Sequence, residues 1–290
     1  MQVNGVQFLC YLSFGSESRY VPLANRTAIA NMSLLGRYRK DPTPLKIRHF
    51  IEPLMLITRP CIALPSIAYS MTFLWATVSN TFEMPQIFPE RYGFNTQQVG
   101  LQNIAFIIGN IMGEQIGGIM SDKWMSKKGR KGARPAPEYR LWLSYIGYAL
   151  ACCGLVVFYV QIDRSGEEWN VTPMVGGAIT TAGNQVITTI LITYAVDCHP
   201  EDSSGIGVFV NFVRQIWGFI GPFWFVFHSA SIKEISLTRH QRFPQLIEAI
   251  GLSGTAGVAV GMIVGVSVVL TVLLQWQSGA WRFTVQDKAA

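Results

Sequence analysis

The chain has 290 residues, of which 50% are hydrophobic and only 14% are charged. Soluble domains carry about 25% charged residues and their helices are amphipathic, so this composition excludes an ordinary soluble protein. The net charge of +6 does not indicate a nucleic-acid-binding protein, because the basic residues fall in short runs between long apolar stretches.

Residues 1–59 are predicted to form a basic segment on the cytoplasmic side of a membrane. The apolar patch at 6–14 is too short to span a bilayer, and it lacks the basic region and cleavage site of a signal peptide. We interpret it as the last turns of a helix whose beginning is missing. The stretch 19–59 is polar, and Pro42 and Pro44 exclude a long helix around them.

Six windows beyond this segment are apolar and long enough to cross a bilayer, which takes about 20 residues. Backbone groups inside lipid must bond to one another, so each crossing is predicted to be a helix. The expected fold class is therefore all-α, a bundle of six transmembrane helices within residues 60–276, followed by a cytoplasmic tail at 277–290. The windows are 60–81, 98–120, 140–161, 172–196, 204–228 and 253–275.

The distribution of lysine and arginine predicts the orientation of the bundle. With residues 1–59 inside the cell, sixteen of these residues fall on cytoplasmic segments and five on external ones. Basic residues accumulate on the cytoplasmic side, so both termini are predicted to be cytoplasmic. The external loops are then 82–97, which contains two prolines, 162–171, and 229–252, which is expected to carry a short amphipathic helix.

Polar side chains form stripes on four of the six helices, at spacings of three, four or seven residues that place them on one face. A single amide or hydroxyl of this kind more often forms a hydrogen bond between helices than lines a cavity. The prediction of a cavity therefore rests on the four stripes together. We expect the first, second, fourth and fifth helices to line a shared polar cavity. The candidate lining residues are Tyr69, Asn103, Asn110, Asn184, Thr188, Asn211 and Trp217.

The third and sixth helices are predicted to lie outside this cavity, because they carry few polar side chains. The sixth has Gly257, Gly261 and Gly265 at intervals of four. Small residues at that spacing allow close helix packing, so this stripe is expected to face a neighbouring helix.

Two charged residues lie well inside the predicted helices. A lone charge at the centre of a membrane helix costs about 2.5–3.5 kcal/mol on insertion scales, so Glu114 and Arg214 need partners or water. Glu114 is equally well interpreted as a protonatable carboxylate or as one member of a structural ion pair. For Arg214 we favour a structural or gating pair, and the sequence does not show whether the two residues touch.

A short motif follows the second helix. Gly118, Asp122 and Lys123 are followed by Gly129 and Arg130, and an aspartate at a helix end can interact with a neighbouring helix dipole and a basic side chain. Such a contact would hold one conformation closed until it breaks. This spacing resembles the cytoplasmic signature of the major facilitator superfamily, although about four additional residues precede Gly129.

Further segments resemble the same family. Residues 137–141 are similar to the start of its ninth helix, residues 194–200 and 211–219 to its tenth and eleventh helices, and residues 16–20 to the end of its sixth. The resemblance is closest to the fungal twelve-helix drug:proton antiporter branch, and it covers only the C-terminal six-helix half. It implies a cavity lined by the family's seventh, eighth, tenth and eleventh helices, which is the partition that the polar stripes predict.

The resemblance implies transport of a small organic molecule, coupled to protons, by alternating access of two halves. The other half would be a missing N-terminal six-helix half or a second copy in a homodimer. The implied location is the plasma membrane, with the vacuolar membrane as the alternative. A non-transporting fragment or regulatory partner is the alternative function.

A membrane-embedded enzyme is a weaker alternative. The four histidines and five cysteines show no metal-binding or catalytic spacing, so no catalytic residue, cofactor or metal site is predicted.

Overall fold

A computed structural model describes residues 51–128, 136–166, 168–227 and 245–286, with side chains described for 51–127, 136–166, 168–221 and 250–277. Residues 51–290 form one unit and residues 1–50 form another. Residues 1–50, which make up most of the predicted basic segment, lie outside the described residues. The described part is mostly helical and contains no strand, which confirms the all-α prediction.

The first predicted crossing begins after a short 3-10 turn at Leu54–Thr58. It consists of α3, Pro60–Phe73, a π-helical stretch at Leu74–Ser79, and α4, Asn80–Tyr92. The prediction of a loop from residue 82 was therefore wrong. Pro85 and Pro89 lie inside α4, and a membrane helix tolerates proline because its surroundings satisfy the freed backbone groups. The helix ends at Gly93, whose φ of 65° is a left-handed conformation that glycine adopts without strain.

The remaining predicted crossings also coincide with helices. They are α5, Thr96–Lys128, then α6, Glu138–Leu141, which leads into α7, Ser144–Arg164, followed by α8, Thr172–Cys198, and α9, Ser203–Phe227. The last crossing is α10, Gln245–Met262, a π-helical stretch at Ile263–Val268, and α11, Val269–Gln286.

Gly251 interrupts α10 with φ 74° and ψ 173°, which separates the short stretch 245–250 from the long helix after it. The short external helix that we predicted within 229–252 thus corresponds in part to 245–250, and residues 229–244 lie outside the described part.

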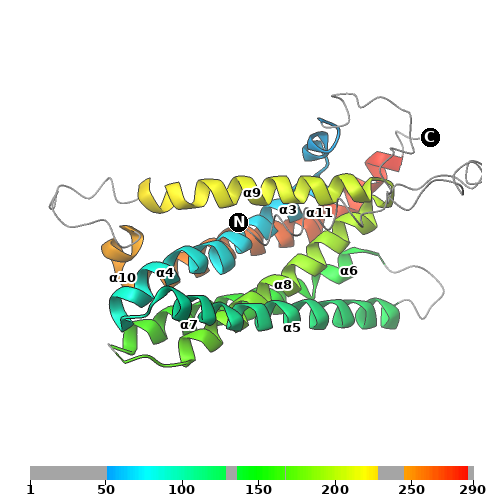
Figure 1. Cartoon of the computed structure of the whole chain (residues 1–290). Coiled ribbons are helices and arrows are strands. Elements are labelled where there is room, and N and C mark those ends of the chain that lie inside the picture. Colours follow the sequence, from blue (N-terminus) through cyan, green and yellow to red (C-terminus); the bar gives the residue numbers. More distant parts are fainter. Residues whose placement is uncertain (1–50, 129–135, 167, 228–244, 287–290) are drawn as a thin grey trace, which may run out of the picture. The chain divides into compact units, whose positions relative to one another are not determined.

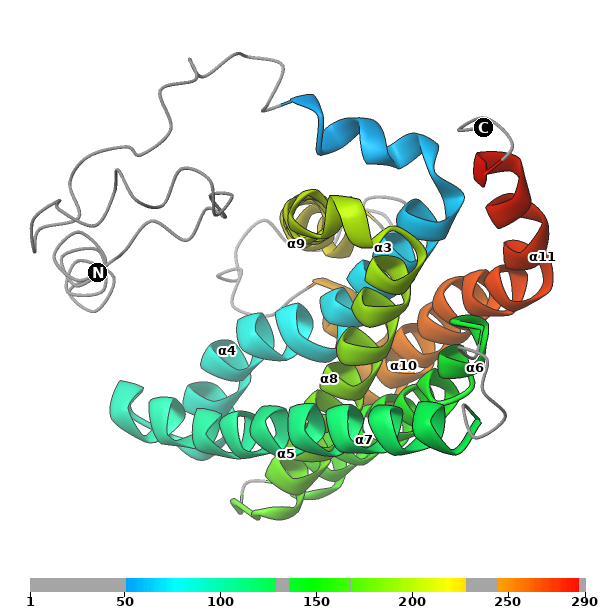
Figure 2. The same ribbon diagram turned by 90° about the vertical axis from the view of Figure 1, so that its right-hand side faces the viewer.

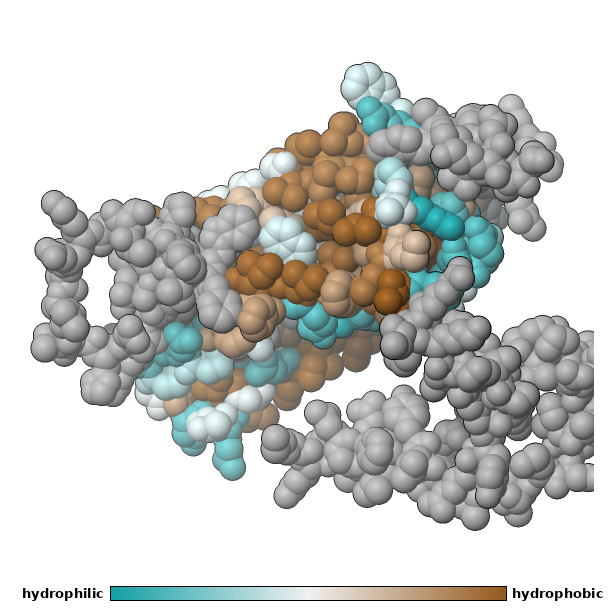
Figure 3. Space-filling model, turned by 90° about the horizontal axis from the view of Figure 1, so that it is seen from above, coloured by the Kyte–Doolittle hydropathy of each residue, from teal (hydrophilic) through white to brown (hydrophobic). Residues whose placement is uncertain are grey.

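Among the described residues, five helical stretches are long and apolar enough to cross a membrane: Pro60–Tyr92, Thr96–Lys127, Glu138–Arg164, Thr172–Cys198 and Ile250–Gln277. The helix α9 adds 25 residues, which is also a spanning length. Figure 3 shows hydrophobic side chains across the middle of one face of the bundle and hydrophilic ones toward both of its ends. The chain is therefore an integral, multi-pass membrane protein.

The central element is α8, which contacts α3, α5, α7 and α9 (Figures 1 and 2). Glycines allow this close approach. A Cβ atom at Gly109 or Gly113 of α5 would collide with the backbone of Ala178 or Ala182 of α8. On the opposite side of α8, a Cβ at Gly183 would lie 2.5 Å from the backbone nitrogen of Ala151 in α7. These helices pack backbone against backbone, as small residues permit in membranes.

The predicted glycine stripe of the last helix behaves differently. Among the described residues, nothing lies within 4 Å of a Cβ built at Gly257, Gly261 or Gly265. The expected close packing at these three positions is therefore not present in the described part of the chain. The last helix instead meets the first through Ser267, whose hydroxyl donates to the Ala68 carbonyl at 2.8 Å and accepts from Thr72 at 3.1 Å.

Replacement of Gly113 by leucine tests the packing of α5 on α8. We expect Gly113→Leu to lower the free energy of unfolding by about 1–3 kcal/mol or more, because the new side chain meets the Ala182 backbone. Gly118→Leu on the same helix is the matched control, since no described atom lies within 4 Å of a Cβ there, and its effect should stay within about 0.5 kcal/mol. Thermal unfolding of both variants in detergent, followed by circular dichroism, measures the difference. Equal losses would show that the glycines do not set the helix spacing.

Candidate functional site

The charge of Arg214 on α9 is held against the first helix. Its Nη1 donates to the Tyr69 hydroxyl at 3.3 Å, and its guanidinium carbon lies 5.0 Å from the centre of the Phe73 ring. A cation over an aromatic face is stabilised by the ring quadrupole. The described acidic residues, Glu114 among them, form no ion pair with Arg214, so the structural or gating pair that we favoured for it stays a prediction.

The two predicted lining residues of α5 and the charged candidate Glu114 share one stripe of this helix. Asn103 and Glu114 are exposed and Asn110 is half-buried. Asn103 donates weakly to the carbonyls of Val99 and Gly100 in its own helix at 3.4 Å. Within the described part of the chain, Glu114 makes no hydrogen bond or ion pair. This stripe runs beside the glycine face that packs on α8, so it is separate from the helix interface.

The predicted residues of α8 are more deeply placed. Asn184 is buried, and its Oδ1 has no hydrogen-bond partner among the described atoms. Thr188 is half-buried and donates to the Asn184 carbonyl one turn earlier at 2.7 Å. The α8 stripe therefore lies largely inside the bundle.

The two predicted lining residues of α9 differ in their exposure. Asn211 is exposed and donates to the Gly207 carbonyl of its own helix at 2.9 Å. Trp217 is half-buried and packs against the core. The structure therefore brings together Tyr69 and Arg214, whereas Asn103, Glu114 and Asn211 remain on exposed helix faces.

The motif after the second crossing is only partly within the described residues, because Gly129 and Arg130 lie outside them. Asp122 and Lys123 are exposed, and no hydrogen bond or ion pair reaches them from the described residues. Gly118 faces open space, whereas a Cβ at its neighbour Gly117 would lie 3.2 Å from Val186 of α8. The glycine that permits the helix approach is therefore Gly117, not Gly118.

An arginine that sequence reasoning did not select joins three helices at this end of the bundle. Arg140 of α6 is buried, and it donates to the Ser121 hydroxyl of α5 at 2.7 Å. It also forms an ion pair with Asp197 of α8 at 3.1 Å. Charge-assisted contacts of this kind fix geometry more strongly than neutral ones.

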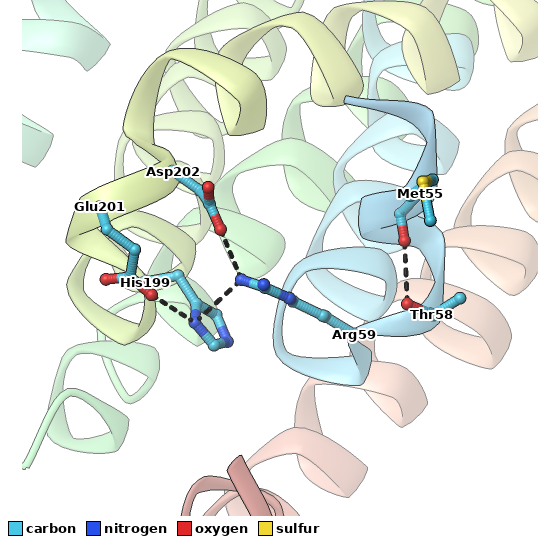
Figure 4. A network of polar contacts seen from close by, with 6 residues as sticks. All are labelled: Met55, Thr58, Arg59, His199, Glu201 and Asp202. Carbon is cyan, nitrogen blue, oxygen red and sulfur yellow. Dashed lines mark hydrogen bonds and ion pairs between the residues drawn. The ribbon is translucent and has the colours of Figure 1, made fainter. Parts of the chain in front are cut away.

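A second network at the same end connects the first crossing with α9 (Figure 4). Arg59, which precedes α3, donates to Asp202 at 2.5 Å, just before α9 begins. Both side chains are more than a third exposed, at 37% and 38%, so the pair positions the helix ends and contributes little to stability.

The buried His199 takes part in this network through one nitrogen. Its Nδ1 lies 3.3 Å from Arg59 Nη1 and 3.3 Å from Glu201 Oε1. Nδ1 accepts from Arg59 only without a hydrogen of its own, and donates to Glu201 only with one, so the two contacts are alternatives. The pKa of Glu201 is lowered, chiefly by a hydrogen bond to its own backbone and further by His199 and Arg59.

Glu83 is one of two acidic residues in the predicted loop 82–97. It lies in α4 and is 2% exposed. The Tyr159 hydroxyl of α7 donates to its Oε2 at 2.6 Å, and Ser79 lies 2.7 Å from the same hydroxyl. With Tyr159 donating to the carboxyl, Ser79 is the donor to Tyr159. An acidic residue within the long helix Pro60–Tyr92 was the signal that could have identified it.

Comparison with known proteins adds independent evidence. The family model of the Major Facilitator Superfamily matches residues 17–222. MFS-type transporter hepF of Aspergillus oryzae is 24% identical over 239 residues, which cover 76% of this chain and 46% of that protein. MFS-type transporter atr4 of Stereocaulon alpinum is 32% identical over 178 residues, covering 59% of this chain and 31% of atr4.

Efflux pump radE of Floropilus chiversii is 27% identical over 205 residues, covering 68% of this chain and 37% of radE. The chain thus spans less than half the length of these relatives. No solved structure matches it significantly.

Replacement of Tyr159 by phenylalanine tests the buried carboxyl site. Tyr159→Phe leaves Glu83 Oε2 without its donor, and we expect it to lower the free energy of unfolding by about 1–3 kcal/mol. The control is Tyr145→Phe, which removes a half-buried hydrogen bond to Gln275 and should cost about 0.5–1.5 kcal/mol. Unfolding of both variants in mixed micelles gives the comparison. If Tyr159→Phe lowers the free energy of unfolding no more than Tyr145→Phe does, the hydrogen bond from Tyr159 to Glu83 does not stabilise the bundle as expected.

Proposed function

Because the chain belongs to the Major Facilitator Superfamily, we propose that it forms one six-helix half of a transporter that moves a small organic molecule across a membrane by alternating access. The family and the names of the relatives are those of transporters and efflux pumps, not of enzymes. The membrane-enzyme alternative is therefore set aside.

The observation that carries the proposal is the exposure of Glu114. It lies near the middle of α5, a helix of 33 residues, on a face that no described residue covers. Contact of a carboxylate with lipid at that depth would cost about 2.5–3.5 kcal/mol, so this face requires water or another polypeptide. Asn103 on the same stripe, and Asn211 on α9, are also exposed, although each bonds to a carbonyl of its own helix.

A second six-helix body would supply the opposing wall. The chain covers 46% of hepF and 31% of atr4, which leaves room in those proteins for another six helices. We propose that an N-terminal six-helix half covers the polar faces of α5 and α9, with a second copy of the chain as the alternative partner. The water between the two bodies would then contact Glu114.

Proton coupling is the second part of the proposal. Glu114 is the carboxylate that would bind and release the proton, since it reaches the proposed water path and has no fixed cation among the described residues. Arg214, held by Tyr69 and Phe73, would keep a positive charge beside that path. This assigns the two charges different roles, because the structure does not pair them.

The substrate is proposed to be a small molecule with an apolar or aromatic body, bound near Tyr69, Asn110, Asn184, Thr188 and Trp217. Phe73 faces the guanidinium of Arg214, so one aromatic face there is already occupied by a cation. Export is the proposed direction, since radE is named as an efflux pump. This would place the chain in the drug:proton antiporter branch.

The cytoplasmic end is proposed to contain the gate. Gly118, Asp122, Lys123, Gly129 and Arg130 would contact the other half there, while the pairs Arg59–Asp202 and Arg140–Asp197 hold the helix ends of this half together. Residues 1–59 and 277–290 would both be cytoplasmic, in agreement with the distribution of basic residues. The plasma membrane is the proposed location, with the vacuolar membrane as the alternative.

Reconstitution tests the proposal. We expect the purified chain alone in vesicles to show no flux of ethidium or carboxyfluorescein under a pH gradient, because it lacks the opposing wall. Co-reconstitution with the first six helices of hepF should restore flux, and Glu114→Gln in that pair should abolish its dependence on the gradient. Intact hepF and Gln115→Leu in the pair are the controls.

Robust gradient-driven flux from the chain alone would contradict the need for an N-terminal half and would leave a second copy of the chain as the partner. Unchanged pH dependence of Glu114→Gln would remove Glu114 from the coupling role.

A further inference from the structure

The guanidinium of Arg214 has aromatic neighbours, but its hydrogen-bonding capacity is only partly used. It lies over the Phe73 ring, and its Nη1 donates to the Tyr69 hydroxyl at 3.3 Å. Its Nε is buried and has no hydrogen-bond partner among the described atoms. An arginine carries five N–H donors and no acceptor, so donors remain here for a group that supplies acceptors.

The elements around Arg214 provide no described acidic side chain that neutralises it. The helix α9 contains no aspartate or glutamate, and neither does the stretch 60–79 of the first crossing, on which it packs. On α8 the acidic residue is Asp197, which is already paired with another arginine. Glu201 and Asp202 precede α9, and the nearer one lies twelve residues from Arg214, about 18 Å along a helix. The positive charge is therefore not offset within the described part of the chain.

Small residues leave room on the face of α9 that carries Arg214. Gly207 lies seven residues before it and Gly218 four residues after it, and these spacings place all three on one face. Among the described atoms, none lies within 4 Å of a Cβ built at Gly207, and at Gly218 the nearest are at 4.0 Å. Arg214 itself is half-buried. No bulky side chain of α9 thus covers the guanidinium from either side along this face.

The groups that surround this space determine what can bind there. The Tyr69 hydroxyl accepts from Arg214, so its own hydrogen remains available to another acceptor. A carboxylate accepts hydrogen bonds from both groups, and its bonds with a guanidinium are charge-assisted. A cationic compound would meet a like charge instead, and the Phe73 face that could have attracted it already holds the guanidinium.

We propose that the transported molecule carries a carboxylate on its apolar or aromatic body, and that Arg214 binds this carboxylate with Tyr69 as a second donor. The inference rests on the proposed function, because it requires this face of α9 to line the transport path. It narrows the substrate class from small organic molecules in general to organic acids. Arg214 then recognises the substrate, and Glu114 carries the proton.

Binding of naphthoate and of naphthamide tests the inference, since the two probes share one ring system and differ in the charged group. Equilibrium dialysis at neutral pH uses the full chain together with the first six helices of hepF in detergent micelles, with protein-free micelles as the blank. We expect naphthoate to bind about tenfold more tightly, the effect of a hydrogen bond to a charged group. Arg214→Gln should abolish this preference and leave naphthamide binding unchanged. Arg214→Lys should retain part of it, because an ammonium keeps the charge but lacks the planar fork.

Two further variants complete the comparison. Tyr69→Phe should weaken naphthoate binding about threefold, because it removes one neutral donor. Arg164→Gln is the matched control: it removes an exposed charge from the end of α7 and should not change the preference. Circular dichroism establishes that each variant is folded before binding is measured.

Equal affinity of the two probes for the unmodified pair would overturn the inference. An equal loss of both probes in Arg214→Gln would also overturn it, since Arg214 would then support the structure without recognising the carboxylate. The flux assay described above decides the transport proposal separately. Flux without a preference for naphthoate would refute the carboxylate site alone, whereas preferential binding without flux would refute transport alone.

Discussion

Every polar group that these helices carry into the membrane needs a partner or water, and this constraint divides the polar side chains into two sets. One set is satisfied inside the bundle. Tyr148 bonds Thr271 at 2.9 Å, Thr72 bonds Ser267 at 3.1 Å, and Tyr159 bonds Glu83 at 2.6 Å, each across two helices. The other set lies on the exposed faces of α5 and α9, where Asn103 and Asn211 bond only to the backbone of their own helices and Glu114 has no partner among the described residues. The first set holds the bundle together, and the second indicates where something else must lie.

Helix packing produces this division. Because Gly109 and Gly113 bring α5 against α8 without intervening side chains, the glycine face is filled by backbone and cannot accommodate the neighbouring amides. Asn103 and Glu114 lie on the adjoining face and are excluded from the interface. A close helix contact and an exposed polar stripe are thus two results of one arrangement of small and polar residues along α5.

The sequence pattern predicted the helices well because length and hydropathy are strong constraints in lipid. It failed at Glu83, since two prolines after it indicated a loop, whereas α4 continues to Tyr92. It also selected the stripe from Gly257 to Gly265 for close contacts, whereas the glycines of α5, α7 and α8 provide them. Spacing shows which residues share a face, but not which neighbour that face meets. For the same reason, sequence could place Arg214 in a helix but not above the Phe73 ring.

The account depends most directly on which residues of α5 face water inside the membrane. Single cysteines at Asn103, Glu114, Ile104 and Ile108, in a chain without its native cysteines that is co-reconstituted with the first six helices of hepF, can be labelled in sealed vesicles with a membrane-impermeant maleimide. Ile104 and Ile108 are 49% and 51% exposed, so they match the polar positions in access but lie on the apolar side. The account predicts rapid labelling of Asn103→Cys and Glu114→Cys, and labelling of Ile104→Cys and Ile108→Cys only after detergent is added. Equally slow labelling at all four positions would show that the polar stripe faces acyl chains, which contradicts a water path shared with a second half.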